Sequence, residues 1–184
     1  WIREYFPKNI SQRNKETGEV IPVTGSGAQY KALLSDFVEL CNAIRRLSVS
    51  DPVVPAENMV GDNNTIYVIY KNLNVITLEE YLIAKGGKLS CEDTCELLIP
   101  LLNAVDNIHM QGIIHRGLSP YTVLVDSKEK IYIDGFSLSA ARTGGSELKA
   151  EFFNGYSAPE QYISTGWQGT WTDVYAVATI FYRT

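Results

Sequence analysis

One long helix constrains the fold of this chain more than any other feature of its sequence. Between residues 28 and 47 the apolar residues recur with gaps of three or one, at Tyr30, Leu33, Leu34, Phe37, Leu40, Cys41, Ile44 and Leu47. A period near 3.6 residues places these side chains on one face of an α-helix. The sequence therefore predicts an amphipathic helix with one buried face.

Strand-like segments lie on both sides of this helix. Residues 1–6 (WIREYF) predict a short strand that ends at Pro7, and residues 8–27 are polar and are expected to form a long loop. The stretch 57–70, ENMVGDNNTIYVIY, predicts two strands around a Gly-Asp-Asn-Asn turn. The first part of the chain is thus expected to be rich in β-structure, with one main helix.

The remaining sequence favours helices. Thr77 and Glu80 have the spacing of a capping box, and a second cap is expected at Ser90. Two short strands are expected at 122–126 and 130–134, after the second of these helices. The order of elements predicts an α+β protein in which a small β-rich part precedes a mostly helical part.

Charge and hydropathy exclude several classes of protein. The 184 residues carry 16 basic and 21 acidic side chains, a net charge of -5, without a basic cluster of the kind that binds nucleic acid. No apolar run reaches the roughly 18 residues of a membrane span. The three cysteines have no zinc-like spacing and fit a reducing compartment. We therefore expect a cytoplasmic protein that neither binds nucleic acid nor inserts into a membrane.

Five motifs give the chain a resemblance to protein kinases. Residues 115–125, HRGLSPYTVLV, resemble the catalytic loop H-R-D-x-x-x-x-N. The other four stretches follow in kinase order: WIREYFP resembles the strand with the ATP-binding Lys, IDGF the D-F-G motif, GYSAPEQY the A-P-E motif, and WTDVYAVATIFYR the helix that anchors the large lobe. The form H-R-x-x-S-P, with EYFP and APEQY, is similar to a bacterial serine/threonine kinase group.

The resemblance covers nearly the whole chain and implies a definite architecture. It implies a two-lobe protein kinase-like fold of the α+β class, with a small lobe at 1–73 and a large lobe at 74–184. It also implies a fragment that lacks the first strands of the small lobe and the last helices of the large lobe.

Four positions that carry chemistry in kinases are changed here. Gly117 replaces the loop Asp and has no side chain with which to accept a proton. Thr122 replaces the Asn that binds a second magnesium ion, and a neutral hydroxyl is a poorer ligand for that hard cation. Arg3 takes the place of the ATP-binding Lys, and Leu40 takes the place of its Glu partner.

The metal motif is retained only in part. It reads Asp134, Gly135, Phe136, so its carboxylate remains while Phe and Gly are exchanged. The resemblance implies that a nucleotide, if it binds, contacts Arg3, Tyr70, Lys71 and Asp134. It allows ATP as a ligand and Asp134 as a cation ligand, but argues against a magnesium site. Leu40 is expected to pack towards Tyr70 or Phe136 and to narrow the nucleotide pocket.

Residues that stabilise the large lobe of kinases are kept. They are His115, Arg116, Glu160 and Asp173. Loss of the chemistry beside a retained scaffold predicts a pseudokinase, a domain that is not an enzyme and acts in signalling by binding a protein. That protein would be a kinase, a substrate or another domain of the same chain. Two alternatives stay open: a nucleotide sensor that works without metal, and an atypical phosphotransferase with residual activity that uses Arg3 and Asp134.

Overall fold

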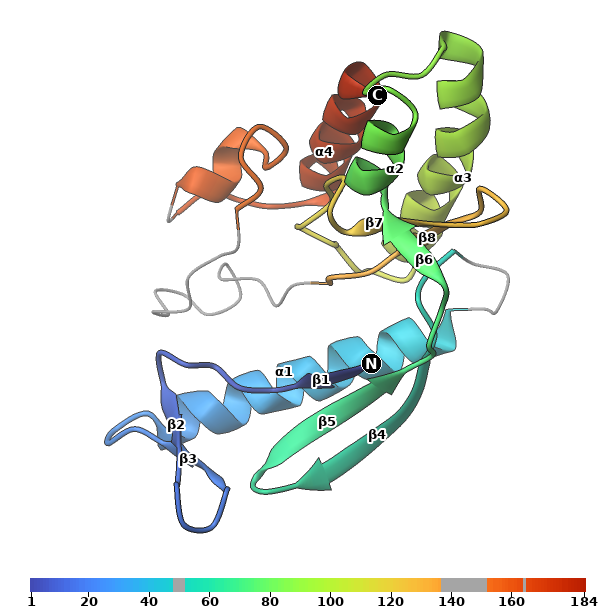
Figure 1. Ribbon diagram of the computed structural model, residues 1–184. Coiled ribbons are helices and arrows are strands. Elements are labelled where there is room, and N and C mark those ends of the chain that lie inside the picture. Colours follow the sequence, from blue (N-terminus) through green and yellow to red (C-terminus); the bar gives the residue numbers. More distant parts are fainter. Residues whose placement is uncertain (48–51, 137–151, 164) are drawn as a thin grey trace.

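A computed structural model describes residues 1–47, 52–136, 152–163 and 165–184. The chain forms two lobes, with the β-rich first part below the helical second part in Figure 1. The observed elements have the α+β order expected from the sequence. The site discussed below lies where the two lobes meet.

An antiparallel sheet forms one side of the small lobe. Its strands are β1 (Ile2–Glu4), β5 (Thr65–Tyr70) and β4 (Ala56–Asp62), in the spatial order β1-β5-β4. The turn between β4 and β5 has positive φ angles at Asn63 (51°) and Asn64 (56°). Two consecutive residues in this region characterise the two-residue turns whose twist matches a hairpin, and Asn tolerates the conformation. The predicted turn is confirmed.

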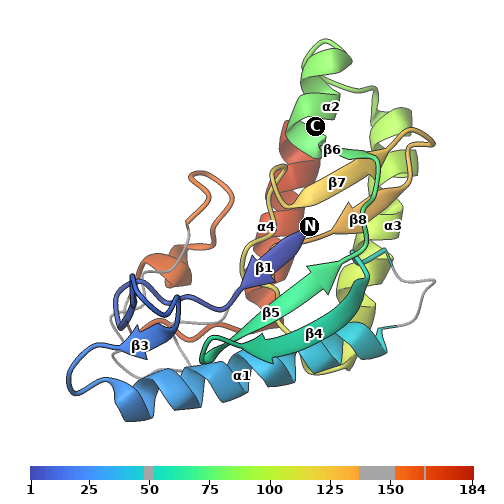
Figure 2. The same ribbon diagram turned by 60° about the horizontal axis from the view of Figure 1, so that its bottom comes forward.

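Helix α1 (Gly27–Arg46) lies along this sheet, as both ribbon views show (Figure 2). Its buried residues, among them Leu33, Phe37 and Cys41, pack into a core with Tyr5 and Val68 of the sheet side. Burial of this apolar face stabilises the helix against the sheet by roughly 1.5–3 kcal/mol for each large side chain. The helix predicted from the apolar period is confirmed.

The expectation of a loop at 8–27 is wrong, because this segment contains a hairpin. It consists of β2 (Ser11–Arg13) and β3 (Val20–Pro22), paired antiparallel. The side chain of Asn14 accepts the Glu16 N–H at 2.8 Å inside the connecting turn, and Gly18 has a φ of 78°. The polar and glycine-rich residues that suggested a loop are the turn itself. A strand of three residues is too short to show the alternation of apolar and polar residues by which a strand is predicted.

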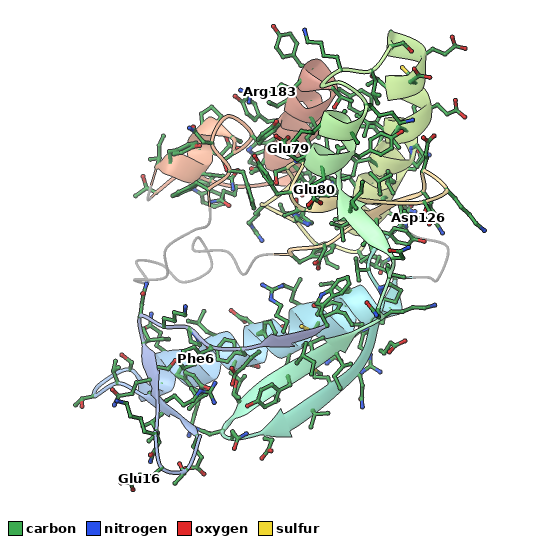
Figure 3. The ribbon with its side chains drawn as sticks, viewed as in Figure 1. Phe6, Glu16, Glu79, Glu80, Asp126 and Arg183 are labelled. Carbon is green, nitrogen blue, oxygen red and sulfur yellow. The ribbon has the colours of Figure 1, made fainter. Side chains whose placement is uncertain are left out.

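A strand that the sequence did not reveal precedes the helices of the second half. Strand β6 (Val75–Thr77) pairs with β7 (Val123–Asp126), which pairs in turn with β8 (Ile131–Ile133). Helix α2 (Leu78–Ala84) follows β6 directly, and Thr77 and Glu80 form the predicted capping box (Glu80 is labelled in Figure 3). The cap at Ser90 is likewise confirmed at the start of α3 (Cys91–Met110).

Among the described residues of this lobe, two long helices and a short one pack beside these strands. Helix α3 packs against α4 (Thr170–Arg183), and the 3₁₀ helix η2 (Pro159–Tyr162) precedes α4. The core between them includes Leu98, Leu101, Ile108 and Ile180, all of which are fully buried. Across the described ranges, no helix combines the length and the apolar character needed to cross a membrane.

Candidate functional site

The loop from His115 to Thr122 joins α3 to β7, and the carboxylate of Asp173 on α4 fixes its first residues. Asp173 accepts the backbone N–H of His115 and that of Arg116, both at 2.7 Å. Its Oδ2 also lies 2.9 Å from Nε2 of His109. Burial alone would raise the pKa of this carboxyl group, but the bonds from His109 and the two N–H groups lower it below its usual value. The carboxylate therefore stays ionised inside the lobe.

Asp173 also stabilises an unusual backbone conformation. Arg116 has a φ of 64°, in the left-handed region that non-glycine residues seldom adopt. Its carbonyl accepts the Gln161 side-chain amide at 2.8 Å, which joins the loop to η2. Glu160, the other predicted scaffold residue, accepts the Thr172 hydroxyl at 2.6 Å. His115, Arg116 and Asp173 are thus brought together, while Glu160 ties η2 to α4.

His115 connects the loop to the segment after β8. Its ring is fully buried, and its Nδ1 accepts the Gly117 N–H at 3.1 Å. Nε2 must then carry the proton, which it donates to the Asp134 carbonyl at 2.8 Å. Burial lowers the pKa of this imidazole, so that the neutral form is favoured. The ring also contacts Phe136, at 4.4 Å between centroids.

Gly117 leaves the expected catalytic position without a side chain, yet the position has room for one. A Cβ built there would lie 3.5 Å from the Phe153 ring and 3.6 Å from the Gly135 carbonyl, which are ordinary van der Waals contacts. Steric crowding at Cβ therefore does not account for the missing carboxylate.

The hydroxyl of Thr122 is fully engaged inside the loop. It donates to the Gly117 carbonyl at 2.7 Å and accepts the Ser119 N–H at 3.0 Å, in a buried position. The Ser119 hydroxyl lies 3.3 Å from the same oxygen, so that the hydrogen and both lone pairs of the Thr122 hydroxyl have partners inside the loop. Thr122 therefore acts as a structural residue of the loop and cannot serve as a metal ligand in this arrangement.

Arg3 on β1 is held by backbone where a kinase has an ion pair. Its guanidinium donates to the Phe136 carbonyl at 2.9 Å and lies over the Phe37 ring. Within the described residues no carboxylate forms an ion pair with it. Glu39 on α1 is exposed, whereas Leu40 is half-buried and packs against the large-lobe core to which Phe136 belongs. Leu40 thus packs on the side of Phe136, while Tyr70 belongs to the small-lobe core.

Asp134 is the free acidic group of the site. It follows β8 and is half-buried, and its side chain forms neither a hydrogen bond nor an ion pair with any residue that the structure describes. Tyr70, at the end of β5, is buried and stacks on Trp1. Burial raises the pKa of the Tyr70 hydroxyl, and the nearby Arg3 charge opposes that rise. Lys71 is exposed just beyond the strand.

The donor set fits a single cation at most. In the parts of the chain that the structure describes, no three His, Cys, Asp or Glu side chains come close enough to form a metal site of their own. Asp134 offers one free carboxylate, and Thr122 offers nothing. Magnesium is commonly bound by one or two carboxylates together with substrate phosphates. Asp134 can therefore hold one such ion together with a nucleotide, but a second ion has no protein ligand among the residues described.

Two residues of this site were missed by the sequence analysis. His109 bonds to Asp173, and the Phe153 ring lies beside Gly117 and stacks on Tyr121 at 6.2 Å. The position of His109 in the last turn of a helix gave no sign of its partner, which is 64 residues away. Phe153 belongs to a stretch without a regular pattern, so that nothing in the sequence indicated its contact with the loop.

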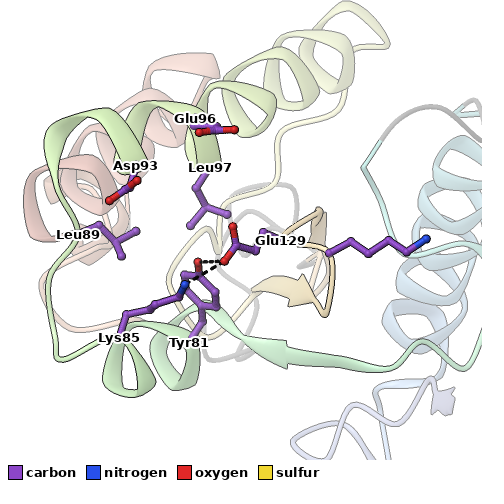
Figure 4. A pocket seen from close by; sticks show the side chains of 8 residues that line it. Tyr81, Lys85, Leu89, Asp93, Glu96, Leu97 and Glu129 are labelled. Carbon is purple, nitrogen blue, oxygen red and sulfur yellow. Dashed lines mark hydrogen bonds and ion pairs between the residues drawn. The ribbon is translucent and has the colours of Figure 1, made fainter.

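A separate pocket of about 320 Å³ lies away from this site, between α2, α3 and the turn joining β7 to β8 (Figure 4). Its charged groups are partly paired with each other, because Glu129 accepts the Tyr81 hydroxyl at 2.8 Å and Lys85 at 3.0 Å. None of the residues predicted for the kinase site lines this pocket.

Comparison with known proteins settles the family. The model of the protein kinase domain matches residues 27–184. The chain belongs to the protein kinase domain family. The kinase fold is also that of a solved structure, PpkA-294 in its apo form, with a TM-score of 0.74 and 22% identity over 98% of this chain and 64% of that one.

Several curated relatives are plant kinases. CBL-interacting serine/threonine-protein kinase 8 of Arabidopsis thaliana is 29% identical over 183 residues, which are 96% of this chain and 40% of that protein. CBL-interacting protein kinase 21 of Oryza sativa subsp. japonica is 31% identical over 134 residues, 71% of this chain and 25% of that protein. This kinase chain thus spans less than half the length of either relative. Its placement in a bacterial group stays a prediction, since both relatives are plant proteins.

These comparisons contradict the expectation that the domain is not an enzyme. The match to the protein kinase domain covers most of the chain, and the relatives are named protein kinases. The exchanges at Gly117 and Thr122 do not by themselves predict the loss of an enzyme. Those exchanges alter the groups available in the kinase site, and they do not remove the chain from a family of enzymes.

Proposed function

We propose that this domain is a serine/threonine protein kinase whose phosphoryl transfer proceeds without a loop carboxylate and is therefore slow. One observation carries the proposal: of the acidic groups at this site, Asp134 is the one that the described residues leave free, in a half-buried position after β8. The polar groups around it are engaged, since the Thr122 hydroxyl, the His115 ring and the Phe136 carbonyl all have partners. A free carboxylate at the metal position is what an ATP-dependent transfer requires.

Each group of the site has a part in this proposal. Asp134 would hold one divalent cation together with the nucleotide phosphates, and that cation would neutralise charge on the transferred group. Arg3 adds a fixed positive charge on the small-lobe side, where Phe136 orients it. Gly117 provides no group to orient the proton of the substrate hydroxyl. General bases typically contribute about 10²–10⁴-fold in rate, and this factor is the expected deficit.

The lobes and partners belong to the same proposal. We assign the small lobe to residues 1–73 and the large lobe to residues 74–184, so that β6 begins the large lobe. ATP is the proposed phosphoryl donor, and a protein with a serine or threonine hydroxyl is the proposed partner. The printed names of the plant relatives describe interaction with CBL proteins. For this chain we propose a protein partner only as the phosphoryl acceptor.

Transfer of labelled phosphate tests this function. The protein carrying this chain is incubated with γ-labelled ATP, magnesium and a serine-rich protein acceptor, beside Asp134→Asn and an exposed control, Asp106→Asn. We expect slow incorporation by the parent and by the control, and at least about tenfold less by Asp134→Asn, because one charge-neutralising ligand is lost. Nucleotide binding without any transfer by the parent would contradict the proposal and would support a sensor instead.

A further inference from the structure

Thr122 and Gly135 meet at a contact too close for any other residue at position 135. Gly135 has a φ of +77°, and a Cβ built on it would lie 2.8 Å from Cγ2 of Thr122 and 3.4 Å from its Cβ. Real Cβ atoms essentially never come within 3.0 Å of another heavy atom, so one of the two residues would have to move. The methyl group of Thr122 therefore occupies the space that a side chain at 135 would need.

That methyl group has little freedom to turn away. The same side chain donates its hydroxyl hydrogen to the Gly117 carbonyl at 2.7 Å and accepts the Ser119 N–H at 3.0 Å. Rotation about the Cα–Cβ bond would break both bonds in a buried place, where unpaired polar groups are unfavourable. The hydrogen bonds of the hydroxyl thus fix the direction of the methyl group.

The contact agrees with the order of the metal motif, in which glycine occupies 135 and the aromatic residue follows at Phe136. There it is buried, its ring contacts His115 and its carbonyl accepts Arg3. The Asp134 N–H donates to the Thr122 carbonyl at 2.9 Å, so that Thr122 contacts both Asp134 and Gly135.

We propose that Thr122 is a positioning residue for Asp134, whose methyl group sets the path of residues 134–136 and whose hydroxyl holds that methyl in place. Thr122, which occupies the position of a metal-binding Asn, thus orients the backbone that carries Asp134 and does not bind a metal. The importance of Asp134 rests on the proposed function, but the packing claim can be tested without nucleotide or activity.

A mutant cycle on thermal unfolding tests the packing. Gly135→Ala, Thr122→Ser and the double variant are compared with Gly112→Ala, because Gly112 has a similar φ of +74° and nothing within 4 Å of its Cβ position. Gly112→Ala thus reports the cost of the backbone conformation alone. Thr122→Ser removes only the methyl group and keeps the hydroxyl.

We expect Gly135→Ala to lower the melting temperature at least about 5 °C further than Gly112→Ala does, or to prevent folding. The double variant should fold, and its melting temperature should fall by no more than the sum of the decreases in Gly112→Ala and Thr122→Ser. Two results would overturn the proposal. In the first, Gly135→Ala lowers the melting temperature no more than Gly112→Ala does. In the second, Gly135→Ala lowers it equally whether residue 122 is Thr or Ser.

The two histidines supply a second readout that does not depend on the unstable variant. In ¹⁵N-histidine spectra, Nε2 of His115 reports its bond to the Asp134 carbonyl, and Nδ1 reports its bond to Gly117. Thr122→Ser should shift the Nε2 resonance and leave Nδ1 and the His109 ring in place. The double variant should return Nε2 towards the parent value, because the Ala methyl fills the vacated space. An unmoved Nε2 resonance in Thr122→Ser would contradict the positioning role, whether or not the protein transfers phosphate.

Discussion

At the scale of single residues, buried polar groups decide what the site can do. The kinase motif allowed His115, Arg116 and Asp173 to be selected from the sequence, and the structure brings these three together around the loop. The bond between Thr122 and the Gly117 carbonyl was not foreseeable, because it depends on the fold of the loop. The lack of space for a side chain at Gly135 could not be predicted for the same reason. It arises from Thr122, which is 13 positions away in sequence and meets Gly135 only in the folded chain.

The buried imidazole of His115 gives the domain a pH-dependent stability. Burial lowers its pKa in the folded state below the ordinary histidine value of 6.5, so that the unfolded chain binds the proton more readily. Stability from this group is therefore present above about pH 6.5 and is lost as the pH falls towards the folded-state pKa. The Asp173 carboxyl, whose pKa is also lowered, contributes its full stability above its ordinary pKa of 3.8 and therefore adds no pH dependence between pH 7.5 and 5.5. We expect the free energy of unfolding to fall by about 1 kcal/mol between pH 7.5 and 5.5.

Chemical denaturation at the two pH values checks this expectation. His115→Gln should remove the dependence at the cost of lower stability overall. Equal stability of the parent at both pH values would show that His115 does not titrate as its burial requires.

At the scale of elements, apolar periodicity and capping residues predicted the helices reliably, whereas the short strands could not be predicted. The apolar period identified α1, and the Thr77 box identified the start of α2. Strands β2, β3 and β6 have three residues each, too few to show an alternating pattern, and they form through pairing with partners that the sequence does not specify. These three strands therefore form because of tertiary contacts and not because of the intrinsic β-propensity of their residues.

Helix α3 contains a feature that opposes its own stability. Pro100 lies in its interior, where it lacks an N–H for the helical ladder and crowds the preceding turn. Its side chain is exposed, so that little packing is lost on replacement. We expect Pro100→Ala to raise the free energy of unfolding by about 1–3 kcal/mol in denaturant titrations. Asn103→Ala, also exposed on α3, provides the control and should change it by less than about 1 kcal/mol. If the free energy of unfolding of Pro100→Ala is unchanged or lower, the proline does not destabilise helix α3 at this position.

At the scale of the whole molecule, the two lobes are joined at the site by Arg3 and Phe136. The guanidinium of the small lobe bonds to the backbone of the segment that carries Asp134, and Leu40 packs on the large-lobe core. The kinase resemblance predicted this meeting of lobes, and the family match confirms the fold. The expectation that the domain is not an enzyme is contradicted by its membership of the protein kinase domain family, because motif residues report which groups are present and do not measure a rate.

The most direct test of the central claim compares the initial rate of phosphoryl transfer in Gly117→Asp with that of the parent. The Cβ position at 117 has ordinary contacts only, so that the first atom of an Asp side chain meets no clash there. If the parent is a kinase slowed by the missing base, Gly117→Asp should transfer phosphate about 10²-fold faster or more, and Asp134→Asn should abolish the gain. Equal rates in Gly117→Asp and the parent, with both proteins folded and bound to nucleotide, would contradict the account.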